Sequence, residues 1–203
     1  MQKLEVFGAN KLKGQIKISG SKNASLPILA ASILSNKKII LKNLPKVKDI
    51  ETMINLLKSL GSKVKFNQNQ ILINNYSQKK KFASYNLVKT MRAGILVLGP
   101  LLAKYGKARI ALPGGCAIGS RPVNYHLDSL RQMGAEIVLK NGYIEASAEN
   151  LQGASIRFDG VTVTGTENLM MAATLAEGTT TLLNVAREPE VADLANMLNS
   201  MGA

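Results

Sequence analysis

The residues best suited to chemistry lie in a glycine-rich segment, Pro113 to Pro122, which contains the single cysteine of the chain. Cys116 follows two glycines and precedes Arg121 by five residues. A thiol in an electropositive, partly exposed loop loses its proton more readily and becomes chemically useful. A buried cysteine is usually just a small hydrophobe. The spacing alone leaves the catalytic and the inert interpretation equally open.

The same segment comes close to the phosphate-binding loop of nucleoside triphosphatases. Gly114 and Gly119 have the required separation, but Ser120 and Arg121 follow where Lys and then Ser or Thr are needed. Triphosphate hydrolysis is therefore disfavoured.

Two further cations occur where an anion could bind. Lys22 lies in Ser19 to Ala24, where a strand is expected to turn into a helix whose N-terminus favours an anion. A structural turn with a solvated lysine is the commoner interpretation. Arg92 interrupts an apolar stretch, 87–102, and either contacts a phosphate or extends its charge to the surface. His126 is the single histidine, without a cysteine or carboxylate cluster, which argues against a metal site.

A recurring pattern supplies the elements that must position these residues. Three helices are predicted to end on a glycine, at Gly61, Gly134 and Gly202. After the first two, a strand and a hairpin turn are expected: 63–66 with Asn67 to Asn69, and 136–139 with Asn141-Gly142. The first and third copies agree over a longer stretch, so each unit reads strand, helix, strand, helix, hairpin. Repeats bury their apolar faces against one another, so several copies make one domain.

The remaining elements complete these units. The expected strands are 1–7, which alternates, 108–112, and two buried strands, 37–43 and 179–184; the expected helices are 26–34, 85–102 and 169–175. The block Thr162 to Asn168 opens the last of these helices, and capping alone explains it. The third copy reaches Ala203 without its hairpin, which we interpret as a truncated unit. A variant domain that ends on a helix is the alternative.

Composition narrows the class of protein. The 203 residues are 46% hydrophobic and carry a net charge of +13, which suggests a globular chain that binds nucleic acid or an anionic small molecule. The densest basic run, Lys79 to Lys81, has no interleaved aromatic residues, so solvated lysines are favoured over a nucleic-acid interface. One cysteine excludes an internal disulfide and fits a reducing compartment, and no apolar stretch reaches membrane-spanning length. A cytoplasmic protein is the default expectation.

Taken together, five blocks resemble the UDP-N-acetylglucosamine 1-carboxyvinyltransferases of the enolpyruvyl transferase family. The blocks occur in order along the whole chain: 21–24, 87–93, 112–123, 175–180 and 186–190. The resemblance implies an α/β fold, an inside-out α/β barrel built from βαβαββ units, and covers only the first half of a two-domain protein. It implies that residues 1–20 form strands of the second domain and that 21–203 form the first domain, incomplete at its C-terminus.

The resemblance also implies a reaction: the enolpyruvyl group of phosphoenolpyruvate moves to the 3′-hydroxyl of UDP-N-acetylglucosamine, phosphate leaves, and peptidoglycan synthesis begins. Lys22 would hold phosphoenolpyruvate, and Asn23 would lie beside the sugar. Cys116 would be the proton donor, the thiol that adds to phosphoenolpyruvate, and the site of fosfomycin-type alkylation. Arg92 and Arg121 would bind phosphate and the nucleotide sugar. The uridine-diphosphate side would be lined by Arg121, Pro122, Val123, Asn124, Tyr125, Val161, Thr162, Val163 and Thr164.

Some features depart from the family pattern. Asn124 stands where relatives commonly have Asp, and Gly160 where some have Lys. The carboxylate base and further arginines belong to the second domain, so we expect no turnover by this chain alone, with a second polypeptide as one source of the missing half. No cofactor, metal, nucleic acid or membrane partner is expected. The alternatives are the shikimate-pathway enolpyruvyl transferase, which has the same repeat architecture, and a non-catalytic remnant domain.

Overall fold

A computed structural model describes residues 3–8, 11, 13–67, 70–75, 82–83, 88, 91–112 and 123–203. The elements follow one another as α1 (Lys22–Ala31), η1 (Ser32–Leu34), β1 (Ile39–Lys42), α2 (Lys48–Ser59), β2 (Lys63–Asn67), β3 (Gln70–Asn74), β4 (Phe82–Ala83), η2 (Arg92–Val97), α4 (Leu98–Tyr105), β5 (Lys107–Ala111), α5 (Asn124–Gln132), β6 (Glu136–Lys140), β7 (Tyr143–Ser147), β8 (Ser155–Arg157), α6 (Val163–Ala173), β9 (Thr181–Leu183) and α7 (Pro189–Met201).

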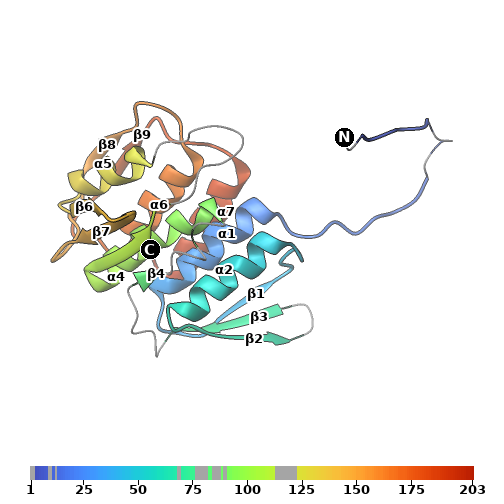
Figure 1. Ribbon diagram of the computed structural model, residues 1–203, viewed down its shortest axis with the longest axis horizontal. Coiled ribbons are helices and arrows are strands. Elements are labelled where there is room, and N and C mark those ends of the chain that lie inside the picture. Colours follow the sequence, from blue (N-terminus) through green and yellow to red (C-terminus); the bar gives the residue numbers. More distant parts are fainter. Residues whose placement is uncertain are drawn as a thin grey trace.

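Helices form the centre of the described part of the chain, and its strands form three small sheets around them (Figure 1). Helix α6 packs against α4, α5, α7 and α1, and α1 packs against α2 and α7. The sheets have the strand orders β1-β3-β2, β4-β5-β7-β6 and β8-β9. The first is antiparallel and the third parallel, whereas the second joins a parallel pair, β4 and β5, to an antiparallel hairpin. The arrangement is of the α/β class.

Three helices end in the same way, as their glycines predict. Gly61, Gly134 and Gly202 have φ angles of 105°, 89° and 103°, in the left-handed region that glycine adopts without strain. The residue after each glycine donates its N–H to a carbonyl five residues back: Ser62 to Leu57, Ala135 to Leu130, and Ala203 to Leu198. This is the Schellman motif, which satisfies carbonyls that the helix end would leave unpaired.

Both predicted hairpins form. Strands β6 and β7 pair across Asn141 and Gly142, which both have positive φ, as a two-residue hairpin turn requires. Strands β2 and β3 pair up to Asn67 and Gln70, and the two residues between them lie outside the described part of the chain. The expectation that β1 and β9 are buried strands is corrected: Ile40 of β1 is 54% exposed and Leu183 of β9 is 41% exposed. Each sheet presents only one face to the helices, so the side chains along a strand alternate between a more buried and a more exposed position.

The helix expected over residues 85–102 is also corrected. Met91 is extended, with φ −139° and ψ 112°, and a 3₁₀ segment, η2, follows it before α4 begins at Leu98. The stretch from Ala93 to Leu102 is apolar because η2 and α4 are buried on most sides, so its composition does not reveal the break.

The N-terminal segment runs away from the body (Figure 1). Its described residues form no strand, and Leu4, Val6, Phe7, Ile16 and Ile18 are between 76% and 90% exposed. The expectation that residues 1–20 are strands of another domain stays a prediction. Among the described residues, no helix is both long and apolar enough to cross a membrane.

Candidate active site

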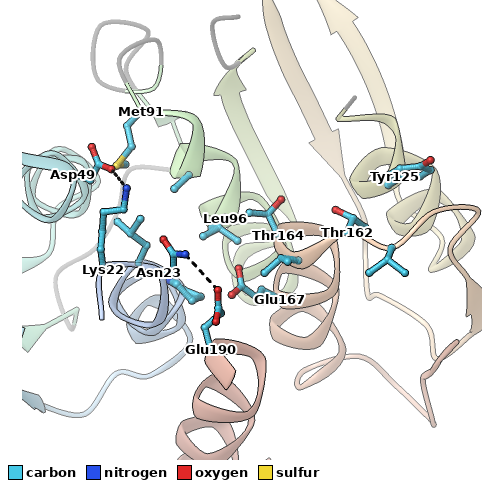
Figure 2. Close-up of a pocket in the computed structure, with 15 residues that line it drawn as sticks. Lys22, Asn23, Asp49, Met91, Leu96, Tyr125, Thr162, Thr164, Glu167 and Glu190 are labelled. Carbon is cyan, nitrogen blue, oxygen red and sulfur yellow. Dashed lines mark hydrogen bonds and ion pairs between the residues drawn. The ribbon is translucent and has the colours of Figure 1, made fainter. Parts of the chain in front are cut away.

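A cavity of about 590 Å³ opens between the helices (Figure 2). Its polar wall comes from the starts of four helices: Lys22 and Asn23 of α1, Asp49 of α2, Thr164 of α6, and Glu190 of α7. Met91, Ala93 and Leu96 supply an apolar wall, and Tyr125 and Thr162 lie at the end away from Lys22. The cavity therefore joins segments from the beginning and the end of the chain.

The convergence of helix N-termini sets the electrostatics of this cavity. The first turn of a helix carries unpaired N–H groups and the positive end of the helix dipole. Such ends attract anions, phosphate in particular. The geometry is therefore suited to a negatively charged ligand before any side chain is considered.

Lys22 adds a formal positive charge at this point. It is the first residue of α1, follows the N-cap Ser21, and its Nζ lies 3.0 Å from Asp49 Oδ2. A cation at a helix N-terminus opposes the dipole, so the position of Lys22 is not explained by helix stability. The two side chains are 48% and 42% exposed, so their ion pair is open to solvent and to competition from another anion.

Asn23 connects the first helix to the last. Its Nδ2 donates to Glu190 Oε1 over 3.4 Å, between residues 167 positions apart in the chain. The bond is long and exposed, hence weak. It turns the Asn23 amide toward the cavity, where Figure 2 shows it between Lys22 and Glu190.

Glu167 is the unusual acid of the site. The residue is 2% exposed, lines the cavity from α6, and its Oε1 has no hydrogen-bond partner among the described residues. Burial, followed by the charges of Glu190 and Glu188, raises the pKa of Glu167 to about 8. At neutral pH the carboxyl group is therefore mostly protonated and can act as a donor.

The start of α6 is fixed by its cap, as the sequence predicts. The Thr162 hydroxyl oxygen accepts from the N–H of Gly165 over 3.2 Å. Thr166 donates its hydroxyl to the Thr162 carbonyl, and its own Oγ1 accepts from the N–H of Ala186. These bonds hold the segment before α7 against α6 and so bring Glu190 to the cavity.

His126 belongs to a buried network. Asn168 Oδ1 accepts from the N–H of Gly99 over 2.7 Å, so its Nδ2 is the atom that faces the Ile95 carbonyl and His126 Nδ1. An amide N–H donor requires an acceptor at Nδ1, which assigns the imidazole proton to Nε2, 3.4 Å from Thr164 Oγ1. His126 thus links α5 to α6, and Asn168 links α6 to η2 and α4. No metal-binding cluster occurs among the described residues.

The cavity brings together seven residues named from the sequence: Lys22, Asn23, Tyr125, Val161, Thr162, Val163 and Thr164. Val123 and Asn124 lie where α5 begins and do not line it. Arg92 opens η2 between two lining residues, and its side chain is not described; Cys116, Arg121 and Pro122 lie outside the described residues. At Gly160, a Cβ atom would come within 2.8 Å of Tyr125 Oη, so the tyrosine occupies the space that a larger residue would need.

Sequence reasoning missed Asp49, Glu167 and Glu190 as parts of the site. Glu167 belongs to the block for which capping alone was a sufficient explanation, although this block opens a helix with few exposed positions. A helix that is apolar on nearly every side buries the polar residues it contains, and that pattern was the available signal.

Comparison with a solved structure shows the fold, and a family model shows the family. The enolpyruvyl transferase NikO from Streptomyces tendae superposes with a TM-score of 0.81 over 97% of this chain and 46% of its own, at 20% identity, which establishes a shared fold. A family model described as EPSP synthase (3-phosphoshikimate 1-carboxyvinyltransferase) matches residues 6–203, and the chain belongs to this family.

Relatives with higher sequence identity carry a different name within this family. The chain is 64% identical to a UDP-N-acetylglucosamine 1-carboxyvinyltransferase from Pelagibacter ubique and 58% identical to one from Idiomarina loihiensis. Each match covers all of this chain and 49% of the relative. The chain thus spans about half the length of the curated relatives it matches.

Proposed function

We propose that this chain contributes to the transfer of the enolpyruvyl group from phosphoenolpyruvate to the 3′-hydroxyl of UDP-N-acetylglucosamine, with release of phosphate. The observation that carries the proposal is the cavity in which Lys22 and Asn23 face Val161 to Thr164 across converging helix N-termini. Both substrates are anionic, which suits these positive helix ends. The names of the relatives at 64% and 58% identity support this acceptor, and the proposal extends to a role in peptidoglycan synthesis.

The proposed reaction requires a proton donor and cationic groups. Protonation of C3 of phosphoenolpyruvate leaves positive charge on C2, which the sugar hydroxyl attacks as it loses its proton to a base. The resulting tetrahedral intermediate then expels phosphate from C2 and loses a proton from C3, which restores the double bond. In this proposal Lys22 neutralises the phosphoenolpyruvate anion and Asn23 contacts the sugar. Cys116 supplies the proton, with Arg92 and Arg121 on the phosphate groups. The base for the hydroxyl would come from a second domain, so the 203-residue chain alone should show no steady phosphate release.

The finer architecture is part of the same proposal: three copies of a βαβαββ unit in an inside-out barrel. The three identical helix ends support a repeat. So do Asn43 and Asn184, which follow β1 and β9 and have φ angles of 59° and 57°. The exposed apolar side chains of the N-terminal segment support its addition as strands to a second body, because such a run of exposed apolar residues marks an interaction surface.

Ligand protection against thermal unfolding tests the acceptor. UDP-N-acetylglucosamine should raise the Tm of the chain, whereas shikimate 3-phosphate should not. Lys22→Met should abolish the shift produced by phosphoenolpyruvate, and Lys63→Met, an exposed lysine of β2 outside the cavity, should preserve it. Protection by shikimate 3-phosphate alone would assign the shikimate-class enzyme instead, and no response to either acceptor would favour a remnant domain.

Labelling of the single cysteine gives a second test. The rate of alkylation at Cys116, followed by intact mass, should change when UDP-N-acetylglucosamine is added if the thiol belongs to the same site. Since the chain has one cysteine, every adduct reports on this position. An unchanged rate at saturating ligand would remove Cys116 from the proposed site.

A further inference from the structure

The roles assigned above leave one buried group unused. Glu167 lines the cavity, is 2% exposed, and its Oε1 has no partner among the described residues. A buried polar atom without a hydrogen bond is costly, and the large majority of such atoms in folded proteins are paired. An anion-binding cavity is also a poor place for a further negative charge. Both facts require an explanation.

Among the described side chains around Glu167, none offers it a cation. From α7 and the residue before it come Glu190 and Glu188, both of which oppose its ionisation electrostatically. From α1, Lys22 is engaged with Asp49 and the Asn23 amide donates to Glu190. From η2, the described lining side chains are apolar, and the side chain of Arg92 is not described. From α5, His126 faces Thr164 and Asn168.

Figure 2 shows Glu167 and Glu190 with their carboxyl groups directed into the same part of the cavity. Two ionised carboxylates that share a site repel each other, and the pair then holds one proton in common. Glu190 is only partly buried and already accepts from Asn23, whereas burial disfavours the charged form of Glu167. The proton therefore resides on Glu167, the more deeply buried member.

We propose that Glu167 is a positioning residue that keeps one proton at the carboxylate end of the cavity, which Glu167 and Glu190 form. This proton allows Glu190 to stay hydrogen-bonded to Asn23 while an anionic substrate binds. Ionisation of Glu167 would place a second negative charge beside Glu190, disturb its contact with Asn23 and repel the substrate. This inference rests on the proposed function for the identity of the ligand. The raised pKa, about 8, is consistent with it.

The affinity for UDP-N-acetylglucosamine as a function of pH is the first test, measured by calorimetry on the full chain. Wild-type affinity should fall by about fivefold to tenfold between pH 7 and pH 9, the order expected for one added charge at partly solvated distances. Glu167→Gln, which is neutral throughout, should bind with a nearly constant affinity. Glu177→Gln removes an exposed carboxylate outside the cavity and should follow the wild-type profile.

A ligand-free measurement separates this inference from the proposed function. The ¹³C carboxyl resonance of Glu167, assigned by its loss in Glu167→Gln, should titrate near pH 8 in the wild-type chain. Titration near the ordinary glutamate value would overturn the inference, as would superimposable binding profiles for wild type and Glu167→Gln. If UDP-N-acetylglucosamine does not bind at any pH, the proposed function fails, and the carboxyl titration alone then decides whether Glu167 holds a proton.

Discussion

Two neighbouring residues of α6 are buried polar side chains with opposite surroundings. Asn168 is 0% exposed and bonds Gly99, Ile95 and His126. Glu167 is 2% exposed, yet its Oε1 bonds nothing among the described residues and the side chain borders a cavity. One turn of one helix thus carries a satisfied polar group facing the core and an unsatisfied one facing the site.

The difference separates fold from function. A buried polar group with complete hydrogen bonds fixes how elements pack, and its removal leaves several partners unpaired. A buried group without partners lowers stability, and sites that bind or react retain such groups. Asn168 should therefore matter mainly for stability, and Glu167 mainly for what the cavity binds.

The largest effect is expected from Asn168→Ala. Loss of the amide leaves the Gly99 N–H and the Ile95 carbonyl without their side-chain partner, and His126 Nδ1 loses a donor. The free energy of unfolding should fall by about 3–5 kcal/mol in a denaturant titration. Asn55→Ala, an exposed asparagine of α2, is the control and should change it by no more than about 0.5 kcal/mol. Equal losses for both variants would erase the distinction.

Glu167→Gln should act through pH. The folded-state pKa, about 8, lies above the ordinary value of 4.5, so the contribution of the neutral carboxyl to stability is complete below the lower value and disappears as pH rises through the higher one. Between pH 5 and pH 8 the wild-type free energy of unfolding should lose about 2–4 kcal/mol that Glu167→Gln does not lose.

The quantity to compare is the slope of the free energy of unfolding against pH, because a buried glutamine side chain changes the absolute stability by itself. Denaturant titrations of the two proteins at several pH values give the difference directly. Parallel curves for wild type and Glu167→Gln would show that this carboxyl titrates alike in both states, and the contrast with Asn168 would then have no electrostatic basis.

Much of the fold could be predicted because its signals are local. The glycines at 61, 134 and 202 and the pair Asn141-Gly142 specify left-handed backbone, and the structure confirms each. The extended backbone at Met91 could not be predicted, because tertiary packing buries η2 and α4 alike and the apolar stretch carries no period that marks the break. Partial exposure of β1 and β9 likewise depends on what covers each sheet.

The site could be predicted only in part. Lys22 stands out as a cation at a helix start, whereas Asn23 and residues 161–164 are named only by the family resemblance; all of them line one cavity. Asp49, Glu167 and Glu190 have no distinctive local pattern. Their role depends on α1, α2, α6 and α7 beginning at one place, which only the three-dimensional arrangement reveals.

A smaller effect is expected at the cap that starts α6. Thr162→Ala removes the acceptor for the Gly165 N–H and should lower the free energy of unfolding by about 1 kcal/mol. Thr162→Ser keeps the oxygen and should recover most of that loss in the same denaturant titration. A loss equal to that of Asn168→Ala would mean that the cavity rim stabilises the fold as strongly as the core network does.

The smallest stability effect, and an opposite functional one, is expected for Asp49→Asn. The ion pair with Lys22 is about half exposed, so its loss should change the free energy of unfolding by less than about 1 kcal/mol, including the favourable placement of Asp49 in the first turn of α2. Phosphoenolpyruvate should nevertheless bind more tightly, by about twofold to fivefold, because Lys22 no longer has a competing anion. Added salt should shrink this gain, since exposed charges are screened. Weaker binding by Asp49→Asn would mean that Asp49 orients Lys22 toward the ligand instead of competing for it, and the first turn of α2 would then belong with Asn168 as a structural support.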